Sequence, residues 1–415
     1  MTSTAPVSDR VVRYPPFGEF VALIALMMSL VALSIDNLLP AFVPIQHEFQ
    51  LASANDAQFI ISSYMIGFAV SQLVYGPLSD SIGRRPSMLI GLAIYLVGTL
   101  MALTAGSFTT LLIARVVQGV GAAASRVLVM TIVRDRYHGQ EMARVMSFVM
   151  MVFIIGPVIA PGSGALMLLL GSWRMIFVSM LALGVGLLTW FSLRMPETLN
   201  PHNRMKASPR AVLEGARQCI TNRVALGYTL AISLMLGTLM GYINSAQQVF
   251  ETDVFKLGPW FPLVFGLIAA VMGVAAFTNA QLVQRVGPRR LSHICTVAFV
   301  LTSLALVLLT VAYGGFPPLV PFSMLLAALH FIFSLSVPNF NALAMEPMGR
   351  IAGTASSFIG AVTTALSTVI GLLVGQAYDG TVLPLALGYL VFSALALAVV
   401  YWTERGRMFR RDGAA

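Results

Sequence analysis

The chain has 415 residues, of which 58% are hydrophobic and only 10% are charged. A water-soluble protein carries about a quarter charged residues, because its whole surface faces water. The composition therefore excludes a cytosolic enzyme and a nucleic-acid-binding protein, and it indicates that most of the chain lies in lipid. The two cysteines, Cys219 and Cys295, are too few for a disulfide framework.

Apolar stretches of about 20 residues, the helix length that crosses a hydrocarbon core about 30 Å thick, recur along the chain. Six are expected at about 20–42, 57–78, 88–104, 108–133, 143–170 and 173–193. Six more are expected at about 224–249, 259–283, 291–313, 319–344, 352–377 and 383–402. Continuous runs of this length predict helices, because strands of a membrane barrel show short alternating segments.

One long polar stretch, 194–223, divides the chain into two halves. The expected organisation is a tail at 1–19, a bundle at 20–193, the linker at 194–223, a second bundle at 224–402 and a tail at 403–415. The turn from Leu78 to Arg85 has an echo from Leu282 to Arg289, which indicates an internal repeat. We predict an all-α membrane protein with twelve transmembrane helices in two pseudo-symmetric six-helix bundles.

The basic residues predict the orientation. All but four of the 25 Lys and Arg residues fall in the tails, the linker or the loops on the same side. The exceptions are Arg174 and Lys256 on the other side, and Arg115 and Arg126 within the fourth span. Because short cytoplasmic loops collect basic residues, we expect both termini in the cytoplasm and a bacterial-type inner membrane location.

The sequence argues against an enzyme, a cofactor or a bound metal. An ATP-driven pump needs a Gly-rich loop followed by Lys, and neither Lys206 nor Lys256 has this context. His330 lies well inside a span, but its half of the chain offers no membrane carboxylate to orient it for hydrolysis. These absences favour a secondary transporter.

Asp36 is the only carboxylate within the predicted spans. A lone buried carboxylate costs several kcal/mol unless it is paired or protonated, so Asp36 is a functional candidate. The alternative is that it only bonds backbone groups freed by Pro40. Arg115 lies roughly 10 Å deep in the fourth span, near the depth of Asp36. We expect an ion pair that proton uptake or substrate entry weakens; the alternative is a static pair.

Arg126 follows Arg115 by eleven residues, which places both within roughly 20° on one helical stripe, with Gln118 between them. If Arg115 faces a cavity, Arg126 does too. We expect Arg126 to act as a filter that rejects organic cations. The alternative is that this long side chain reaches the membrane interface or bonds backbone carbonyls.

The turn after the second span joins two helices within eleven residues, from Gly76 to Pro86. Gly83 permits a backbone conformation that other residues resist, and Asp80 can pair with Arg84 or cap a helix. Sorting of basic residues to one side explains Arg84 and Arg85 but not the glycine spacing.

The fifth span carries Gly156, Pro157 and Pro161. The prolines remove helix hydrogen bonds, and glycine allows a neighbouring helix to approach closely. A bend with close packing is the commoner meaning of this pattern, and a gating hinge is the rarer one.

These motifs resemble those of a known family. The segment Gly76-Pro-Leu-Ser-Asp80-Ser-Ile-Gly83-Arg84-Arg85-Pro86 resembles the signature after the second span in the major facilitator superfamily. Ile113-Ala-Arg115-Val-Val-Gln118-Gly119-Val-Gly121 is similar to the fourth-span motif of its drug:proton antiporters. Softer patterns resemble the bicyclomycin and chloramphenicol resistance branch: Asp36-Asn37-Leu-Leu-Pro40, Arg134-Asp135, Pro157 with Pro161, and Asn341 through Ser356.

The resemblance implies a rocker-switch exporter with a cavity lined mainly by spans 1, 4, 7 and 10. Asp36 and Arg115 fall on its proton and coupling positions, Asp80 and Arg84 on its conformational lock, and Pro157 on its antiporter motif. Met28 stands where some relatives have a second acid, and the fifth span lacks the usual Gly-Gly after Gly-Pro.

We therefore expect a monomeric, proton-coupled exporter of amphipathic antibiotics such as phenicols. Its partners are a small molecule, protons and the lipid bilayer. The polar cavity candidates, which could instead bond neighbouring helices, are Asn244, Gln247, Gln248, Asn339 and Asn341. A metabolite or organic-anion exporter on the same fold, and a non-transporting receptor or scaffold, are the alternatives.

Overall fold

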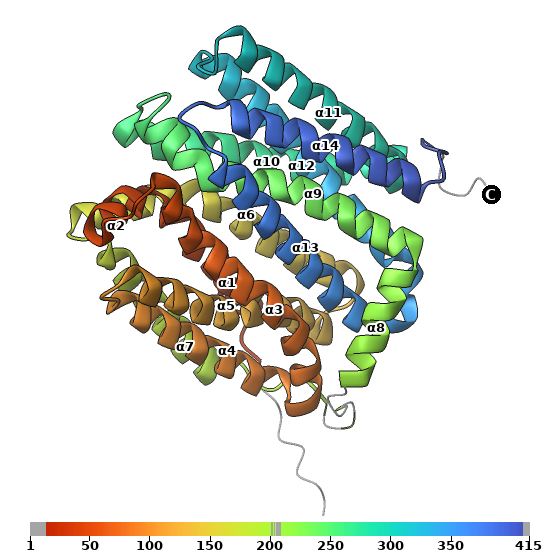
Figure 1. Ribbon diagram of the computed structural model, residues 1–415. Helices are drawn as coiled ribbons and strands as arrows, with labels where there is room; N and C mark the ends of the chain where they lie inside the picture. Colours follow the sequence, from red (N-terminus) through yellow and green to blue (C-terminus); the bar gives the residue numbers. More distant parts are fainter. Residues whose placement is uncertain (1–13, 201, 203, 205–208, 410–415) are drawn as a thin grey trace, which may run out of the picture.

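The structure is a computed structural model that describes residues 14–200, 202, 204 and 209–409 (Figure 1). The start of the expected N-terminal tail (1–13), Lys206 of the linker and the end of the expected C-terminal tail (410–415) lie outside these residues. The described residues form helices joined by turns, without a strand among them.

The first half contains seven α-helices and two short 3-10 helices, η1 and η2. Their bounds are α1 Phe17–Asp36, η1 Leu39–Ala41, α2 Phe42–Phe49, η2 Ala54–Gln58, α3 Phe59–Ile82, α4 Arg84–Leu103, α5 Phe108–Arg136, α6 Gly139–Leu169 and α7 Arg174–Arg194.

The second half follows the linker helix α8, Pro209–Thr221. Its elements are α9 Arg223–Ala246, η4 Gln247–Thr252, η5 Gly258–Trp260, α10 Phe261–Val286, α11 Pro288–Ala312, α12 Leu319–Met345, η6 Glu346–Ile351, α13 Ala352–Gln376 and α14 Leu383–Thr403.

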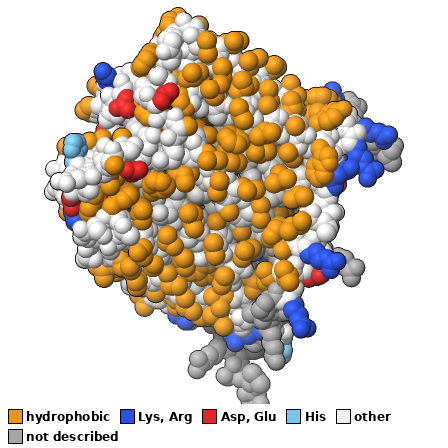
Figure 2. Space-filling view, in the orientation of Figure 1, with side chains coloured by type: hydrophobic (Ala, Val, Ile, Leu, Met, Phe, Trp, Pro, Cys, Tyr) orange, Lys and Arg blue, Asp and Glu red, His pale blue; other side chains and the backbone are white. Residues whose placement is uncertain are grey.

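Within the described part of the chain, eleven helical stretches are long and apolar enough to cross a membrane. The twelfth is α6, which has 31 residues and whose described apolar part is Ile155–Leu169. Hydrophobic side chains cover the middle of the molecule, and Lys and Arg side chains gather toward one end (Figure 2). The predicted fold of apolar helices in two bundles is confirmed.

The two halves lie side by side, with their long helices running in similar directions (Figure 1). They meet where α3 packs on α13 and where α6 packs on α10. We call the end that carries α8 and the turn from α3 to α4 the linker end. The opposite end, where α3 begins at η2 and α13 finishes, is the far end.

Two helices depart from the continuous spans expected from the sequence. The first span breaks after Asp36 and continues through η1 into α2, because Pro40 has no N–H to extend the α-helical hydrogen bonds. The seventh span ends in a π-helix, η4, which widens its last turn. In addition, the linker contains a helix, α8, which the sequence analysis did not predict.

Close backbone contacts hold α3 against α5. A Cβ atom at Gly119 would collide with the Tyr64 carbonyl, and one at Gly67 would collide with the Val116 carbonyl. Both contacts require glycine, because the two helix backbones touch at these points.

Replacing Gly119 with Ala should therefore force α3 and α5 apart. We expect Gly119→Ala to destabilise the protein by about 1–3 kcal/mol and to lower its melting temperature in detergent, measured by fluorescence-detected size exclusion after heating. Gly186→Ala on α7 is the matched control, because a Cβ there meets no atom within 4 Å. Equal melting temperatures for the two variants would contradict the packing argument.

Candidate functional site

Arg115 of α5 is completely buried and joins three helices of the first half. Its Nε donates to the Ile60 carbonyl of α3 at 3.1 Å, and its Nη2 donates to the Ser34 carbonyl of α1 at 2.8 Å. Its Nη1 donates to Gln118 Oε1, and its guanidinium lies 4.5 Å from the centre of the Tyr64 ring. The cation is thus stabilised by neutral oxygens and an aromatic face.

The Ser34 carbonyl is available to Arg115 because α1 ends two residues later. The Leu38 N–H donates to the Ile35 carbonyl at 3.3 Å, so it does not continue the α-helical pattern to Ser34. Carbonyls at the end of a helix need an outside donor, and Arg115 supplies one here.

Asp36 is the last residue of α1, and only 4% of it is exposed. Its Oδ1 is buried and has no hydrogen-bond partner among the described residues. The expected ion pair with Arg115 is not formed in this conformation: none of the ion pairs found in the described ranges includes Asp36. Arg115 instead donates to the carbonyl of Ser34, which lies two residues before Asp36 in the last turn of α1. The backbone between Ser34 and Asp36 therefore connects the two charged side chains.

The break in α1 is also fixed by α6. Gly164 has no room for a side chain because the Asn37 carbonyl lies against it. The Ser163 hydroxyl donates to Asn37 Oδ1 at 2.7 Å. These contacts hold the turn that follows Asp36 against a helix that also touches the second half.

The candidate antiporter motif lies on this same helix. Pro157 and Pro161 are inside α6, and Gly156 faces α1. At the residue after Pro157, a Cβ at Gly266 of α10 would lie 2.8 Å from the Val158 carbonyl. The motif therefore lies where α6 packs between the first half and α10, which is the close packing expected from its glycines and prolines.

In the second half, α9 and the π-helix η4 that follows it carry polar atoms that are buried but unpaired. Tyr242 Oη, Asn244 Oδ1, Ser245 Oγ and Gln247 Nε2 have no hydrogen-bond partner among the described residues. Buried groups with open hydrogen-bonding capacity mark places where a ligand or ordered water binds.

Aromatic rings surround these groups in the second half. The Tyr242 ring stacks on Phe265 with centroids 5.5 Å apart and lies 4.7 Å from the His330 ring. His330 Nε2 is 3.3 Å from the Tyr389 hydroxyl. The second half therefore places several neutral polar atoms beside flat aromatic rings.

Two expected cavity residues bond neighbouring helices instead. Gln118 donates to Thr99 Oγ1 at 2.8 Å within the first half, and it is completely buried. Asn339 donates to Asn279 Oδ1 of α10 at 2.8 Å. Asn341 is exposed and donates to its own helix at the Val337 carbonyl. In this conformation, Gln118 and Asn339 serve helix packing, because their amides are already satisfied.

Arg126 differs from Arg115 although the two lie on one stripe of α5. Arg115 is completely buried, whereas Arg126 is exposed. Arg126 makes no ion pair or hydrogen bond with the parts of the chain that the structure describes. Its positive charge therefore has no counter-charge among the described residues.

The turn from α3 to α4 forms an ion-pair network inside the first half. Arg84 Nε donates to Asp135 Oδ2 at 3.0 Å, and its Nη1 donates to Asp80. Gly83 has φ of 110°, which explains the need for glycine at this position. Glu197, which the sequence analysis missed, accepts from the Arg84 backbone N–H at 2.9 Å. The sequence feature that could have indicated Glu197 is its position as an acidic residue just beyond the last turn of α7.

The expected lock residues thus find their partners within their own half in this conformation. Arg85 Nη2 donates to the Ser192 carbonyl of α7 at 2.7 Å. Gly76 is the motif residue that faces the second half, where Ser357 Oγ would lie 2.9 Å from an added Cβ.

At the far end, four amide side chains join the halves. We call Asn55, Gln58, Gln248 and Gln376 the amide cluster. Gln58 Nε2 donates to Gln248 Oε1 at 2.9 Å, and Gln248 Nε2 donates to Asn55 Oδ1 at 2.7 Å. Gln376 Nε2 donates to the Asn55 carbonyl at 2.7 Å. The far end is therefore closed by neutral hydrogen bonds, and Gln248, expected in the cavity, belongs to this closure.

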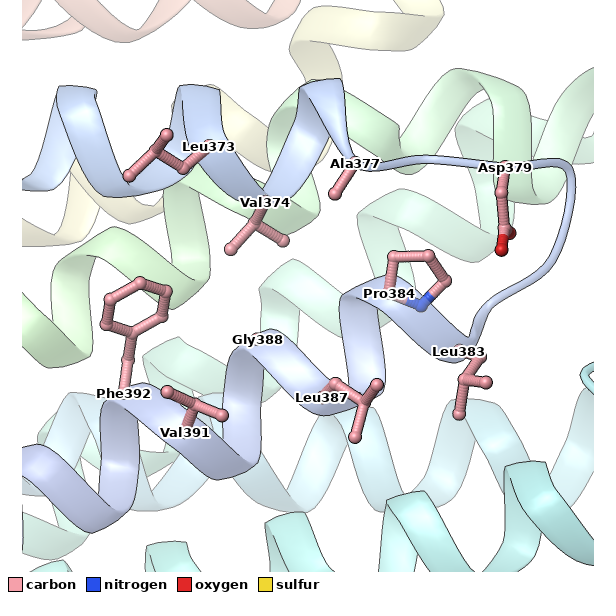
Figure 3. Close-up of a pocket in the computed structure, with 10 residues that line it drawn as sticks. All are labelled: Leu373, Val374, Ala377, Asp379, Leu383, Pro384, Leu387, Gly388, Val391 and Phe392. Atoms are coloured by element: carbon pink, nitrogen blue, oxygen red, sulfur yellow. The ribbon is translucent and has the colours of Figure 1, made fainter.

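A groove of about 370 Å³ lies between α13 and α14 (Figure 3). Leu373, Leu387 and Val391 line it and are largely exposed, and Asp379 is its one acidic residue. It opens on the hydrophobic surface and is formed by other helices than those that carry Asp36 and Arg115. We therefore regard it as part of the lipid-facing surface.

Two packed halves of apolar helices are typical of a membrane protein. Residues 24–372 match the Major Facilitator Superfamily. The chain belongs to this superfamily, which is a family of transporters and not of enzymes.

Curated relatives support a more specific grouping. The chain is 29% identical to a bicyclomycin resistance protein homolog of Haemophilus influenzae over 88% of this chain and 91% of that protein. It is 30% identical to the multidrug resistance protein MdtL of Shewanella oneidensis over 86% of this chain and 90% of that protein.

Solved structures show the same fold. A bacterial homolog of the human lysosomal transporter Spinster, in an inward-facing and unoccupied conformation, superposes with a TM-score of 0.71 and 16% identity. The alignment covers 96% of this chain and 99% of the other.

The amide cluster predicts the effect of Gln248→Leu. This change removes two hydrogen bonds between the halves, one to Gln58 Nε2, which keeps its bond to the Gly375 carbonyl, and one to Asn55 Oδ1. Closure of the far end should therefore weaken by about 2 kcal/mol, or about thirtyfold in the closed-to-open ratio. Double electron–electron resonance between nitroxides at Gly106 and Tyr313, on far-end turns of the two halves, should show longer distances.

Gln218→Leu is the control, because it removes only a hydrogen bond to Glu214 on the exposed side of α8. A distance distribution for Gln248→Leu that matches the control would show that the amide cluster does not hold the far end closed.

Proposed function

We propose that this transporter exports amphipathic drugs, including phenicol-like antibiotics, in exchange for protons. The observation that carries the proposal is the buried Asp36 carboxylate, whose Oδ1 lacks a partner among the described residues, at the break in α1 that packs on α6. A carboxylate in this position binds a proton readily, because its charge is poorly solvated. The relatives named for bicyclomycin and multidrug resistance support drug export.

The coupling step is proposed to run through the break in α1. A proton on Asp36 removes a charge beside the turn that Arg115 and α6 hold in place. Substrate that fills the junction displaces the proton, and the two loads therefore alternate on one site. Because proton and substrate exclude each other, we expect the arrangement of the halves with a proton bound to differ from the arrangement with substrate bound.

We place the protein in a bacterial inner membrane with the linker end in the cytoplasm. Basic side chains gather at the linker end, and the far end carries few (Figure 2). The closed amide cluster then faces outward, and solutes enter from the cytoplasm past Arg126.

The alternative function is export of an anionic metabolite on the same fold. Arg126 favours it, because this exposed cation has no carboxylate partner within the described residues. An unpaired cation near the entrance attracts anions and repels organic cations.

Asp36→Asn should abolish substrate-induced proton release while leaving the fold intact. Asparagine keeps the shape of the side chain, and no hydrogen bond to Oδ1 is lost. Proton release is measured with a pH-sensitive dye when a phenicol is added to purified protein. Asp379→Asn, in an exposed turn of the second half, should release protons as the parent does. Release by Asp36→Asn at the parent level would refute the assignment.

Arg126→Cys in a cysteine-free background should react with a small charged thiol reagent, and substrate should protect it. Ile113→Cys is the control: Ile113 is 53% exposed but lies on the opposite side of α5, so a thiol there faces lipid. Arg126→Ala should shift export toward cationic drugs. A cysteine at 126 as unreactive as the one at 113 would place Arg126 outside the solute path.

A further inference from the structure

The linker helix α8 has one side fixed on the second half. A Cβ at Gly215 would lie 2.8 Å from Thr354 Oγ1 of α13. Cys219 is 2% exposed, and its Sγ is 3.7 Å from Met348 Sδ of η6. The helix is therefore held in a defined rotation, and its remaining sides must face something other than the helical bundle.

Two aliphatic side chains on α8 remain uncovered. Leu213 is 72% exposed and Ile220 is 52% exposed. They are seven residues apart, about two helical turns, so they form one stripe roughly 10 Å long. Exposed aliphatic side chains are normal on the membrane spans, but α8 is a polar helix outside the spans, where water would leave this stripe poorly solvated.

A stripe of arginines runs beside the aliphatic stripe. Arg210 and Arg217 have the same seven-residue spacing, and both are exposed. They are offset by about 60° from Leu213 and Ile220 around the helix, whereas Glu214 and Gln218 lie on the arginines' other side. Around the circumference of α8, the side packed on the second half is thus followed by the aliphatic stripe, then by the arginine stripe, and then by the side that carries Glu214 and Gln218.

The place of α8 in the fold adds a second observation. Asn222 follows α8 and caps α9, with its Oδ1 accepting from the Val224 and Ala225 N–H groups. Because α9 is an apolar span that begins at Arg223, α8 ends at the membrane boundary. It crosses the end of the bundle at a steep angle to the long helices (Figure 1).

We infer that α8 is an interfacial helix that inserts Leu213 and Ile220 among acyl chains while Arg210 and Arg217 bind the phosphates of anionic lipid headgroups. The order of stripes is that of a helix lying in the membrane surface, with the cations at headgroup level between lipid and water. Two arginines next to one glutamate give this surface a net positive charge, which selects anionic over zwitterionic lipid. The contact of Gly215 with Thr354 then links the lipid composition to the position of α13, and the contact of Cys219 with Met348 links it to η6.

The test uses full-length protein carrying one nitroxide at Leu213, Ile220 or Gln218 in a cysteine-free background. The protein is placed in vesicles of phosphatidylcholine alone or of phosphatidylcholine with phosphatidylglycerol. Collision rates with oxygen, which concentrates in lipid, and with a water-soluble nickel chelate give the depth of each label. We expect labels at 213 and 220 to favour oxygen several-fold more than the label at 218, and to move deeper when phosphatidylglycerol is present.

The double variant Arg210→Gln, Arg217→Gln should keep the labels at lipid depth in both membranes but lose the response to phosphatidylglycerol. A label at 213 as accessible to nickel as the label at 218 would overturn the inference. Distances between labels at 213 on separate molecules that resemble a contact pair would also overturn it, because a second copy of the chain would then cover the stripe.

Discussion

The hydrogen bond from Arg115 to the Ser34 carbonyl is the interaction on which the arrangement of the first half depends. It satisfies a backbone group at the break in α1, and through Ile60 it fixes α3 to the same point. Lysine could not replace this residue, because the bonds leave a planar group in several directions at once. The break leaves Asp36 at the end of α1. Arg115 fixes the position of this helix end but does not form an ion pair with Asp36.

This arrangement meets two requirements of the proton exchange that we propose. A direct pair between Asp36 and Arg115 would hold the carboxylate ionised and would hinder proton uptake. Directing the guanidinium to carbonyls stabilises the cation and leaves Asp36 Oδ1 without a hydrogen-bond partner among the described residues. The cost is an unsatisfied buried group, which is typical of sites where a protein sacrifices stability for function.

The apolar spans, their division into halves and the family could be predicted from the sequence, because each depends on composition or on a local motif. The depth of Asp36 and Arg115 could be estimated too. Their pairing could not, because the direction in which each side chain points depends on helix rotation and on the carbonyl freed near Pro40. Arg115 and Arg126 share a stripe, yet one is buried and the other exposed, because burial depends on which neighbouring helices cover each turn of α5 and not on the stripe alone. Gln248 reached the amide cluster through a π-helix, which shifts side chains after Ala246 from their α-helical positions.

The amide cluster has a consequence for how the protein responds to its surroundings. Its hydrogen bonds join neutral groups, so the membrane potential does little work when they break, and added salt does not screen them. A closure made of ion pairs would be weaker at high salt concentration and stronger at low salt concentration. This one keeps nearly the same strength at both salt concentrations, so changes in salinity would leave the closure of the far end almost unchanged.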